Sequence, residues 1–106
     1  METIAFKMKL HPGQKDEYRR RHAEVWPDLQ QLLKEYGISD YSIFLDEETN
    51  ILFAVQKLEE KEPRIDLRSH PVMKKWWDYM ADIMDVNPDN SPVAVPLEQV
   101  FYLNNK

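Results

Sequence analysis

The sequence SDYSIFLDEETNILFAVQKL occupies residues 39–58 and contains two apolar runs joined by a short polar segment. The runs, residues 39–46 and 51–58, carry β-branched and aromatic side chains, which favours strands. Only Glu47 to Asn50 separate them, and a connection this short typically joins antiparallel neighbours. We therefore predict an antiparallel hairpin in the middle of the chain.

The N-terminal third of the chain predicts a strand and then an interrupted helix. Residues 3–10 alternate apolar and polar side chains, which is typical of a strand with one apolar face. Residues 14–36 carry apolar side chains three and four positions apart, which is helical spacing. Pro27 lies inside this pattern and disfavours helical geometry at the residue before it, so we expect a break or kink near residues 23–27. Gly37 is expected to end the helix.

The C-terminal half predicts a second helix and a last strand. Residues 64–84 have helical apolar spacing, with Ser69 expected as the N-terminal cap and Pro71 in the first turn. Residues 87–92, NPDNSP, crowd two prolines with four turn-forming residues and are predicted to be irregular. Residues 97–103, LEQVFYL, are predicted to form the last strand.

The order strand, helix, strand, strand, helix, strand predicts an α+β fold of the ferredoxin-like βαββαβ type, with helices on one face of a four-stranded antiparallel sheet. A length of 106 residues fits one domain over residues 1–106. By strand alternation, Phe44 points away from the helices if Ile43 points toward them. Because this outer face needs a cover, we predict a homodimer joined through the sheet faces, a dimeric α+β barrel, by analogy with similar folds.

Composition excludes several classes of partner and chemistry. The net charge of −5 and the isoelectric point near 5.1 argue against nucleic acid and anionic membranes. The run of arginines at residues 19–21 is interpreted as the solvated flank of a helix. The absence of cysteine excludes disulfides and thiolate chemistry. No signal peptide or transmembrane stretch is visible, so we expect a cytoplasmic protein.

The residues also argue against a metal or a nucleotide cofactor. The three histidines are scattered, and the two glycines stand far apart, which leaves no paired metal ligands and no phosphate-binding loop. Asp78 and Asp82 share a helix face and are expected to be solvated. Asp85 and Asp89 are candidate acid/base groups, although turn-forming side chains that bind backbone are the commoner role.

Several aromatic residues and one histidine predict a pocket. His22 lies one helical turn after Tyr18, either as a core histidine or as an acid/base group, and the break near Pro27 would leave room beside it. Trp76 and Trp77 diverge by about 100°, so we expect one in the core and the other at the edge of a cavity. With Tyr41 from the second strand, these residues suit a neutral polar ligand such as a sugar.

The chain resembles the L-rhamnose mutarotase family over essentially its whole length. The runs EYRRRH at 17–22 and VWPDL at 25–29 are similar to the family's first-helix signature. The other matching runs are YSIFLD at 41–46, KWWDYM at 75–80, NPDNSP at 87–92 and VFYL at 100–103.

This resemblance implies an isomerase of rhamnose catabolism that interconverts the α and β anomers of L-rhamnose, or of a related 6-deoxy sugar or aldose. It also implies a dimeric ferredoxin-like fold without metal or cofactor. His22 matches the proton donor, and Tyr18, Tyr41, Trp76 and Trp77 match the substrate-contacting positions. Ring opening needs a base at the anomeric hydroxyl and an acid at the ring oxygen, and our hypothesis for the second group is Tyr18 or a water that it holds.

Two alternative functions use the same fold. One is a cofactor-free oxygenase or a haem-binding protein, in which His22 would be the haem ligand, and a haem titration tests it. The other is a stress-type dimer without enzymatic activity, which predicts that the protein leaves sugar exchange unchanged.

Overall fold

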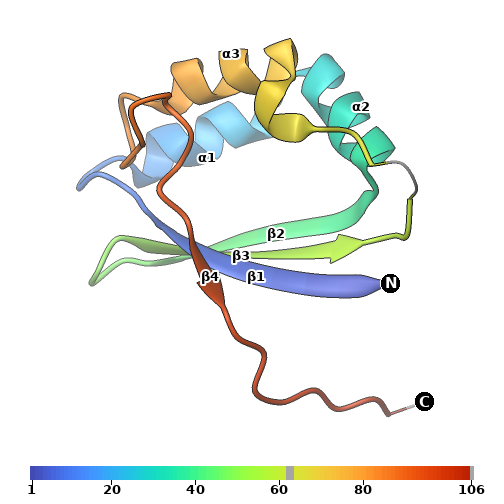
Figure 1. The fold of residues 1–106 in the computed structure, drawn as a ribbon. Helices are drawn as coiled ribbons and strands as arrows, with labels where there is room; N and C mark the ends of the chain where they lie inside the picture. The colour runs from blue at the N-terminus through green and yellow to red at the C-terminus, as the bar shows by residue number, and fades with distance from the viewer. Residues whose placement is uncertain (62–63, 106) are drawn as a thin grey trace.

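The computed structural model describes residues 1–61 and 64–105 and contains one sheet covered on one side by helices (Figure 1). The predicted α+β ferredoxin-like order is confirmed. The elements are, in chain order, β1 (Glu2–Lys9), α1 (Lys15–Ala23), α2 (Pro27–Tyr36), β2 (Ile38–Asp46), β3 (Ile51–Leu58), the 3-10 turn η1 (Leu67–Ser69), α3 (Pro71–Met80) and β4 (Val95–Leu97).

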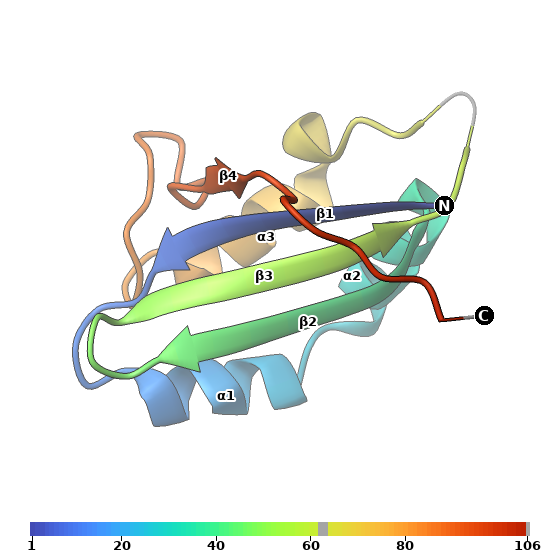
Figure 2. The same cartoon turned by 90° about the horizontal axis from the view of Figure 1, so that it is seen from below.

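The sheet has the strand order β2-β3-β1-β4, and every neighbouring pair is antiparallel (Figure 2). The predicted hairpin forms β2 and β3. Its turn is held by the Asn50 amide, which donates to the Asp46 carbonyl at 2.8 Å, and by the Glu48 amide, which donates to the Asp46 carboxylate at 3.1 Å. Asn50 takes a positive φ of 60°, which asparagine tolerates better than most residues. The hairpin is therefore specified by its own local sequence.

The predicted break in the first helical region is confirmed. α1 ends at Ala23, Trp26 is extended with φ −63° and ψ 136°, and Pro27 occupies the first turn of α2. Gly37 ends α2 in the left-handed region, and a Cβ there would lie 3.0 Å from the Glu59 carbonyl oxygen. Both ends of α2 thus follow from the backbone limits of one proline and one glycine.

Two predictions about the C-terminal half are wrong. The cap of α3 is His70 and not Ser69, because the His70 ring accepts the Val72 amide at 3.2 Å. The last strand is Val95–Leu97, and residues 98–103 pair with no strand of the described chain. These residues form an arm that leaves the sheet on the face opposite the helices (Figures 1 and 2). An apolar run predicts a strand only where a neighbouring strand is available to pair with it.

The core lies between the sheet and the helices, and the opposite face of the sheet is open. Alternation along β2 places Ile43 against the core, while Phe44 is 64% exposed, as expected. Phe53, which pairs with Phe44 across β2 and β3, is also exposed. The buried core consists of Met8, Leu10, Leu29, Leu32, Leu52, Ala54, Trp76, Trp77, Met80, Ile83 and Met84.

Candidate active site

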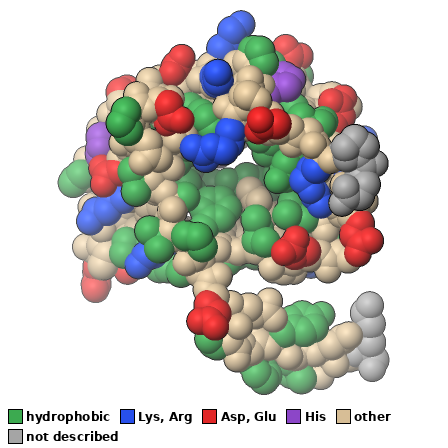
Figure 3. Space-filling model, viewed as in Figure 1, with side chains coloured by type: hydrophobic (Ala, Val, Ile, Leu, Met, Phe, Trp, Pro, Cys, Tyr) green, Lys and Arg blue, Asp and Glu red, His purple; other side chains and the backbone are tan. Residues whose placement is uncertain are grey.

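A large cavity opens between the helix layer and the sheet. Its volume is about 860 Å³, and Figure 3 shows the hollow with hydrophobic side chains inside it and basic side chains on its rim. A smaller hollow of about 70 Å³ shares part of its wall. The structure brings together all five predicted site residues, because both hollows are lined by Tyr18, His22, Tyr41, Trp76 and Trp77.

His22 is held in one tautomer by its own helix. Its Nδ1 lies 3.0 Å from the backbone oxygen of Tyr18, one turn earlier in α1. A carbonyl oxygen only accepts, so Nδ1 carries the hydrogen and Nε2 keeps a lone pair. Burial lowers the pKa of His22 below its ordinary value of 6.5, and the hydrogen bond to Tyr18 opposes this shift. The imidazole is therefore neutral near pH 7 and able to act as a base.

Aromatic rings surround this imidazole. The Tyr18 ring stacks on it with centroids 4.2 Å apart, and Trp76 meets it edge-on at 5.3 Å. Trp26 meets Trp76 edge-on at 5.1 Å and so extends the cluster. Trp26 lies directly before Pro27, where the chain turns between α1 and α2, and it is not among the residues that line the cavity.

The two adjacent tryptophans do not divide their roles as expected. Trp76 and Trp77 are 7% and 9% exposed, so both are buried, and both line the cavity. The cavity is wide enough for two diverging side chains of α3 to border it. Arg68 covers part of this wall, with its guanidinium 5.7 Å from the centre of the Trp77 ring.

The two tyrosines of the cavity remain protonated at neutral pH. Burial raises the pKa of Tyr18 far above 10, and the neighbouring Tyr41 adds to this shift. Burial also raises the pKa of Tyr41, although 40% of its side chain is exposed. The exposure and the raised pKa are consistent because Tyr41 lines the cavity, where its ring is accessible to solvent but surrounded by protein. Each phenol is thus suited to donate a hydrogen bond and poorly suited to lose its proton.

A family model described as L-rhamnose mutarotase matches residues 3–103 of the chain. The chain belongs to the L-rhamnose mutarotase family. It is 61% identical over 103 residues to an L-rhamnose mutarotase of Formosa agariphila, covering 97% of this chain and 99% of the relative. It is also 61% identical over 104 residues to an L-rhamnose mutarotase of Sinorhizobium fredii, covering 98% of this chain and all of the relative.

Solved structures agree with this assignment to the mutarotase family. The crystal structure of an L-rhamnose mutarotase from Formosa agariphila superposes with a TM-score of 0.92 at 60% identity, covering 98% of this chain and all of that one. A Mycobacterium tuberculosis protein superposes with a TM-score of 0.57 at 10% identity, covering 96% of this chain and 97% of that one. At that identity the second likeness extends to the fold alone.

The other candidate groups of this mutarotase-family chain have structural partners. His11 pairs with Asp85 at 3.2 Å, His70 caps α3, and the Asp89 carboxylate accepts the Ser91 amide at 3.0 Å. Within residues 1–61 and 64–105, no group of three His, Cys, Asp or Glu side chains is arranged to hold a metal ion. No helix in the same residues is long and apolar enough to cross a membrane.

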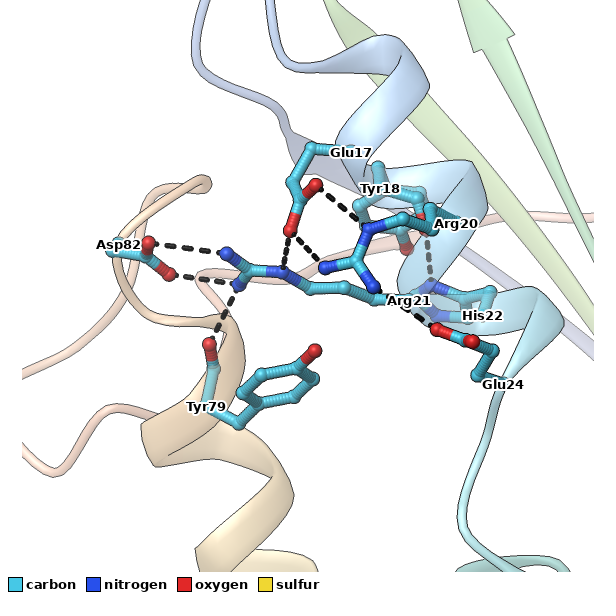
Figure 4. Close-up of polar contacts among 8 residues, drawn as sticks. All are labelled: Glu17, Tyr18, Arg20, Arg21, His22, Glu24, Tyr79 and Asp82. Carbon is cyan, nitrogen blue, oxygen red and sulfur yellow. Dashed lines mark hydrogen bonds and ion pairs between the residues drawn. The ribbon is translucent and has the colours of Figure 1, made fainter.

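One arginine departs from the interpretation of residues 19–21 as a solvated flank. Arg21 is buried, with only 9% of its surface exposed. Its guanidinium lies between Glu17 of the same helix and Asp82, a residue expected to be solvated (Figure 4). The correction has a physical reason: residues 21 and 82 are distant in sequence, so the composition of either segment alone gives no sign of the pair.

Proposed function

We propose that this chain interconverts the α and β anomers of L-rhamnopyranose, as an isomerase acting in rhamnose catabolism. The observation that carries this proposal is the position of the His22 imidazole, which lies at the wall of an aromatic cavity with its Nδ1 3.0 Å from the Tyr18 backbone oxygen. Membership of the mutarotase family supports the choice of sugar. Ring opening in mutarotation moves a proton from O1 to O5, two oxygens that are both bonded to C1. A side chain that titrates close to neutral pH suits this proton transfer.

His22 is suited to carry out both proton transfers of ring opening. Its Nε2 lone pair accepts the proton of the anomeric hydroxyl as the C1=O1 bond forms and the C1–O5 bond breaks. The imidazolium then gives the same proton to O5, and burial makes it a stronger acid by lowering its pKa. Because O1 and O5 are both bonded to C1, one nitrogen lies within reach of both. Rotation about C1–C2 and reversal of these steps give the other anomer.

The remaining site residues are assigned to sugar binding. The indole rings of Trp76 and Trp77 present apolar faces that suit the C–H groups of a pyranose and the methyl group of a 6-deoxy sugar. The phenols of Tyr18 and Tyr41 offer hydrogen-bond donors to sugar hydroxyls. A related 6-deoxy sugar or aldose that keeps these contacts is expected to be accepted as well.

Exchange between the anomers tests the function directly. One anomeric proton of L-rhamnose is saturated by NMR irradiation, and the loss of intensity at the other anomer is followed with and without protein. We expect transfer above the buffer rate for L-rhamnose and a smaller effect for D-glucose and L-fucose. If intact protein gives no more transfer than buffer, the proposed function is wrong, and a haem titration then tests the alternative.

Replacing Tyr18 with phenylalanine tests the earlier hypothesis that Tyr18 is the second proton-transfer group. We expect kcat to fall less than about tenfold and KM to rise, because the stacked ring stays in place and only a hydrogen bond is lost. The measurement is anomeric exchange as a function of L-rhamnose concentration. A fall in kcat of about 10²-fold or more would instead assign Tyr18 a proton-transfer role.

We further propose a homodimer joined through the outer faces of the sheets. The open face carries the exposed Phe44–Phe53 pair, and the arm at residues 98–103 ends in four exposed apolar residues, VFYL. Both features lie on the side of the sheet away from the helices (Figure 1), and in the proposed dimer a second copy of the chain covers this face and packs against the arm. For a protein of sugar catabolism with net charge −5, we propose a cytoplasmic location and no nucleic-acid or membrane partner.

Replacing Phe44 with lysine tests the dimer. We expect the molar mass measured by light scattering to fall to about half, because the two-fold axis would bring two buried lysines into one interface. The control is Gln31→Lys, which adds the same charge on exposed α2 in the helix layer. A Phe44→Lys protein that keeps the intact protein's mass would place the interface elsewhere.

A further inference from the structure

The helix that carries His22 has little apolar attachment to the rest of the protein. Of the nine residues of α1, only Arg21 is buried. Tyr18 packs against the core from a half-buried position, and most of the other side chains are charged. A helix of nine residues is marginal in isolation, so its place depends on contacts with other elements. The contacts of Arg21 are therefore central to where His22 lies.

Arg21 joins α1 to the C-terminal end of α3 through several hydrogen bonds (Figure 4). Its Nη1 donates to the Tyr79 carbonyl at 2.7 Å and to Asp82 Oδ1 at 2.8 Å. Its Nη2 donates to Asp82 Oδ2 at 3.2 Å, and its Nε donates to Glu17 Oε2 at 2.7 Å. The Tyr79 carbonyl belongs to the last turn of α3, where carbonyls lack helical partners, and a cation is favoured there.

The charges of this cluster compensate one another. Arg20 and Arg21 hold the pKa of Glu17 at about 2, and Arg21 holds the pKa of Asp82 below its usual range. The same carboxylates raise the pKa of Arg21. Burying a guanidinium is costly unless it is paired and hydrogen-bonded, and here each of its three nitrogens donates to a carboxylate or to a backbone carbonyl. The planar guanidinium of arginine can donate to both carboxylates and to the carbonyl at once, and the ammonium group of a lysine cannot.

The cluster lies next to the aromatic rings that border the imidazole. The guanidinium of Arg21 stands 4.6 Å from the centre of the Tyr79 ring, and Tyr79 contacts Trp76 at 5.6 Å between ring centres. Trp76 is the ring that meets His22 edge-on. The bonds of Arg21 to the end of α3 thus fix α1 against the same helix that supplies the tryptophans of the cavity.

We propose that Arg21, held by Asp82, is a positioning residue for the reaction: it fixes α1 against α3 and so sets the place of the His22 imidazole in the cavity. This proposal rests on the proposed function for its kinetic consequence. Its structural consequence, the environment of His22, is measurable without any sugar.

The kinetic test compares three variants. Arg21→Lys and Asp82→Asn are expected to lower kcat for anomeric exchange at least tenfold, with a smaller change in KM, because the sugar-contacting rings of α3 and β2 remain. Arg20→Met is the matched control. Arg20 lies on the same helix and also binds Glu17, at 2.7 Å, but it is exposed, and its contact with α3 is to the Tyr79 phenol and not to Asp82 or to the Tyr79 carbonyl. We expect the control to keep the intact protein's kcat.

The decisive readout is the titration of His22 followed by NMR of its imidazole. Tyr18 and Tyr41, which line the same cavity, stay protonated and add no charge. Removing the negative charge of Asp82 lowers the pKa of His22 if charge alone matters. If α1 loosens, the imidazole becomes more solvated and its pKa rises toward 6.5. We expect a rise in Asp82→Asn and in the charge-conserving Arg21→Lys, and no change in Arg20→Met.

The proposal is overturned if the titration of His22 and kcat are both unchanged in folded Asp82→Asn and Arg21→Lys proteins. It is also overturned if the pKa of His22 falls in the Asp82→Asn protein. Asp82 is exposed at the surface, so its variant keeps the core intact. If the intact protein catalyses no exchange, the proposed function fails, but the titration still decides whether Arg21 positions His22.

Discussion

The His22→Ala protein loses anomeric exchange above the buffer rate, a fall in kcat of about 10²–10⁴-fold, while its fold is retained. The expected loss is large because one imidazole is assigned both proton transfers, so no second side chain is left to perform either step. Retention of the fold follows from the half-buried position of His22 on a polar helix. The measurement is saturation transfer between the anomers of L-rhamnose, with circular dichroism to confirm folding.

His11→Ala is the matched control for this loss. His11 is paired with Asp85 and lies outside the residues that line the cavity, so the same substitution there leaves exchange near the intact rate. Exchange by His22→Ala at more than about a tenth of the intact rate would show that another group moves the proton.

The Trp76→Ala protein loses about 3–5 kcal/mol of unfolding free energy, the range for large aromatic truncations in a core. Trp76 is buried and contacts His22, Trp26 and Tyr79 through its ring. Its removal joins a new void to the existing cavity and takes away the edge-on partner of the imidazole. A marginally stable domain has little free energy to spare, so part of the protein is expected to be unfolded at 37 °C.

Urea denaturation measures this change, and Trp76→Phe serves as the comparison. Phenylalanine keeps an apolar ring at the site and is expected to recover about half or more of the lost free energy. A loss below about 1 kcal/mol in Trp76→Ala would contradict the assignment of Trp76 to the core and leave it only a sugar-binding role.

Sequence reasoning succeeded where the determining interactions are local. The polar segment between β2 and β3 specifies its hairpin, and Pro27 specifies the break between α1 and α2, because each limits the backbone within a few residues. Tyr18 and His22 of the predicted pocket lie together because residues four apart share one face of a helix.

Sequence reasoning failed where the structure of a segment depends on residues distant in the sequence. Arg21 resembled its exposed neighbours Arg19 and Arg20, and only the folded chain places Asp82 beside it. Residues 98–103 have the composition of a strand, but the described chain offers them no neighbour to pair with. The burial of Arg21 and the path of the arm therefore depend on tertiary context that a local pattern does not contain.

Because ion pairs attach α1 to the rest of the protein, the stability of this attachment depends on pH. Glu17 and Asp82 have lowered pKa values in the folded chain. Their contribution to the stability of the fold is therefore complete above the ordinary carboxylate pKa values, and it is lost as the pH falls toward the pKa values of the folded chain. The apolar side chains of the core do not titrate and carry no such dependence. We therefore expect acid to weaken the attachment of α1 before the apolar core opens, so that the amide hydrogens of α1 exchange with solvent before those of the core.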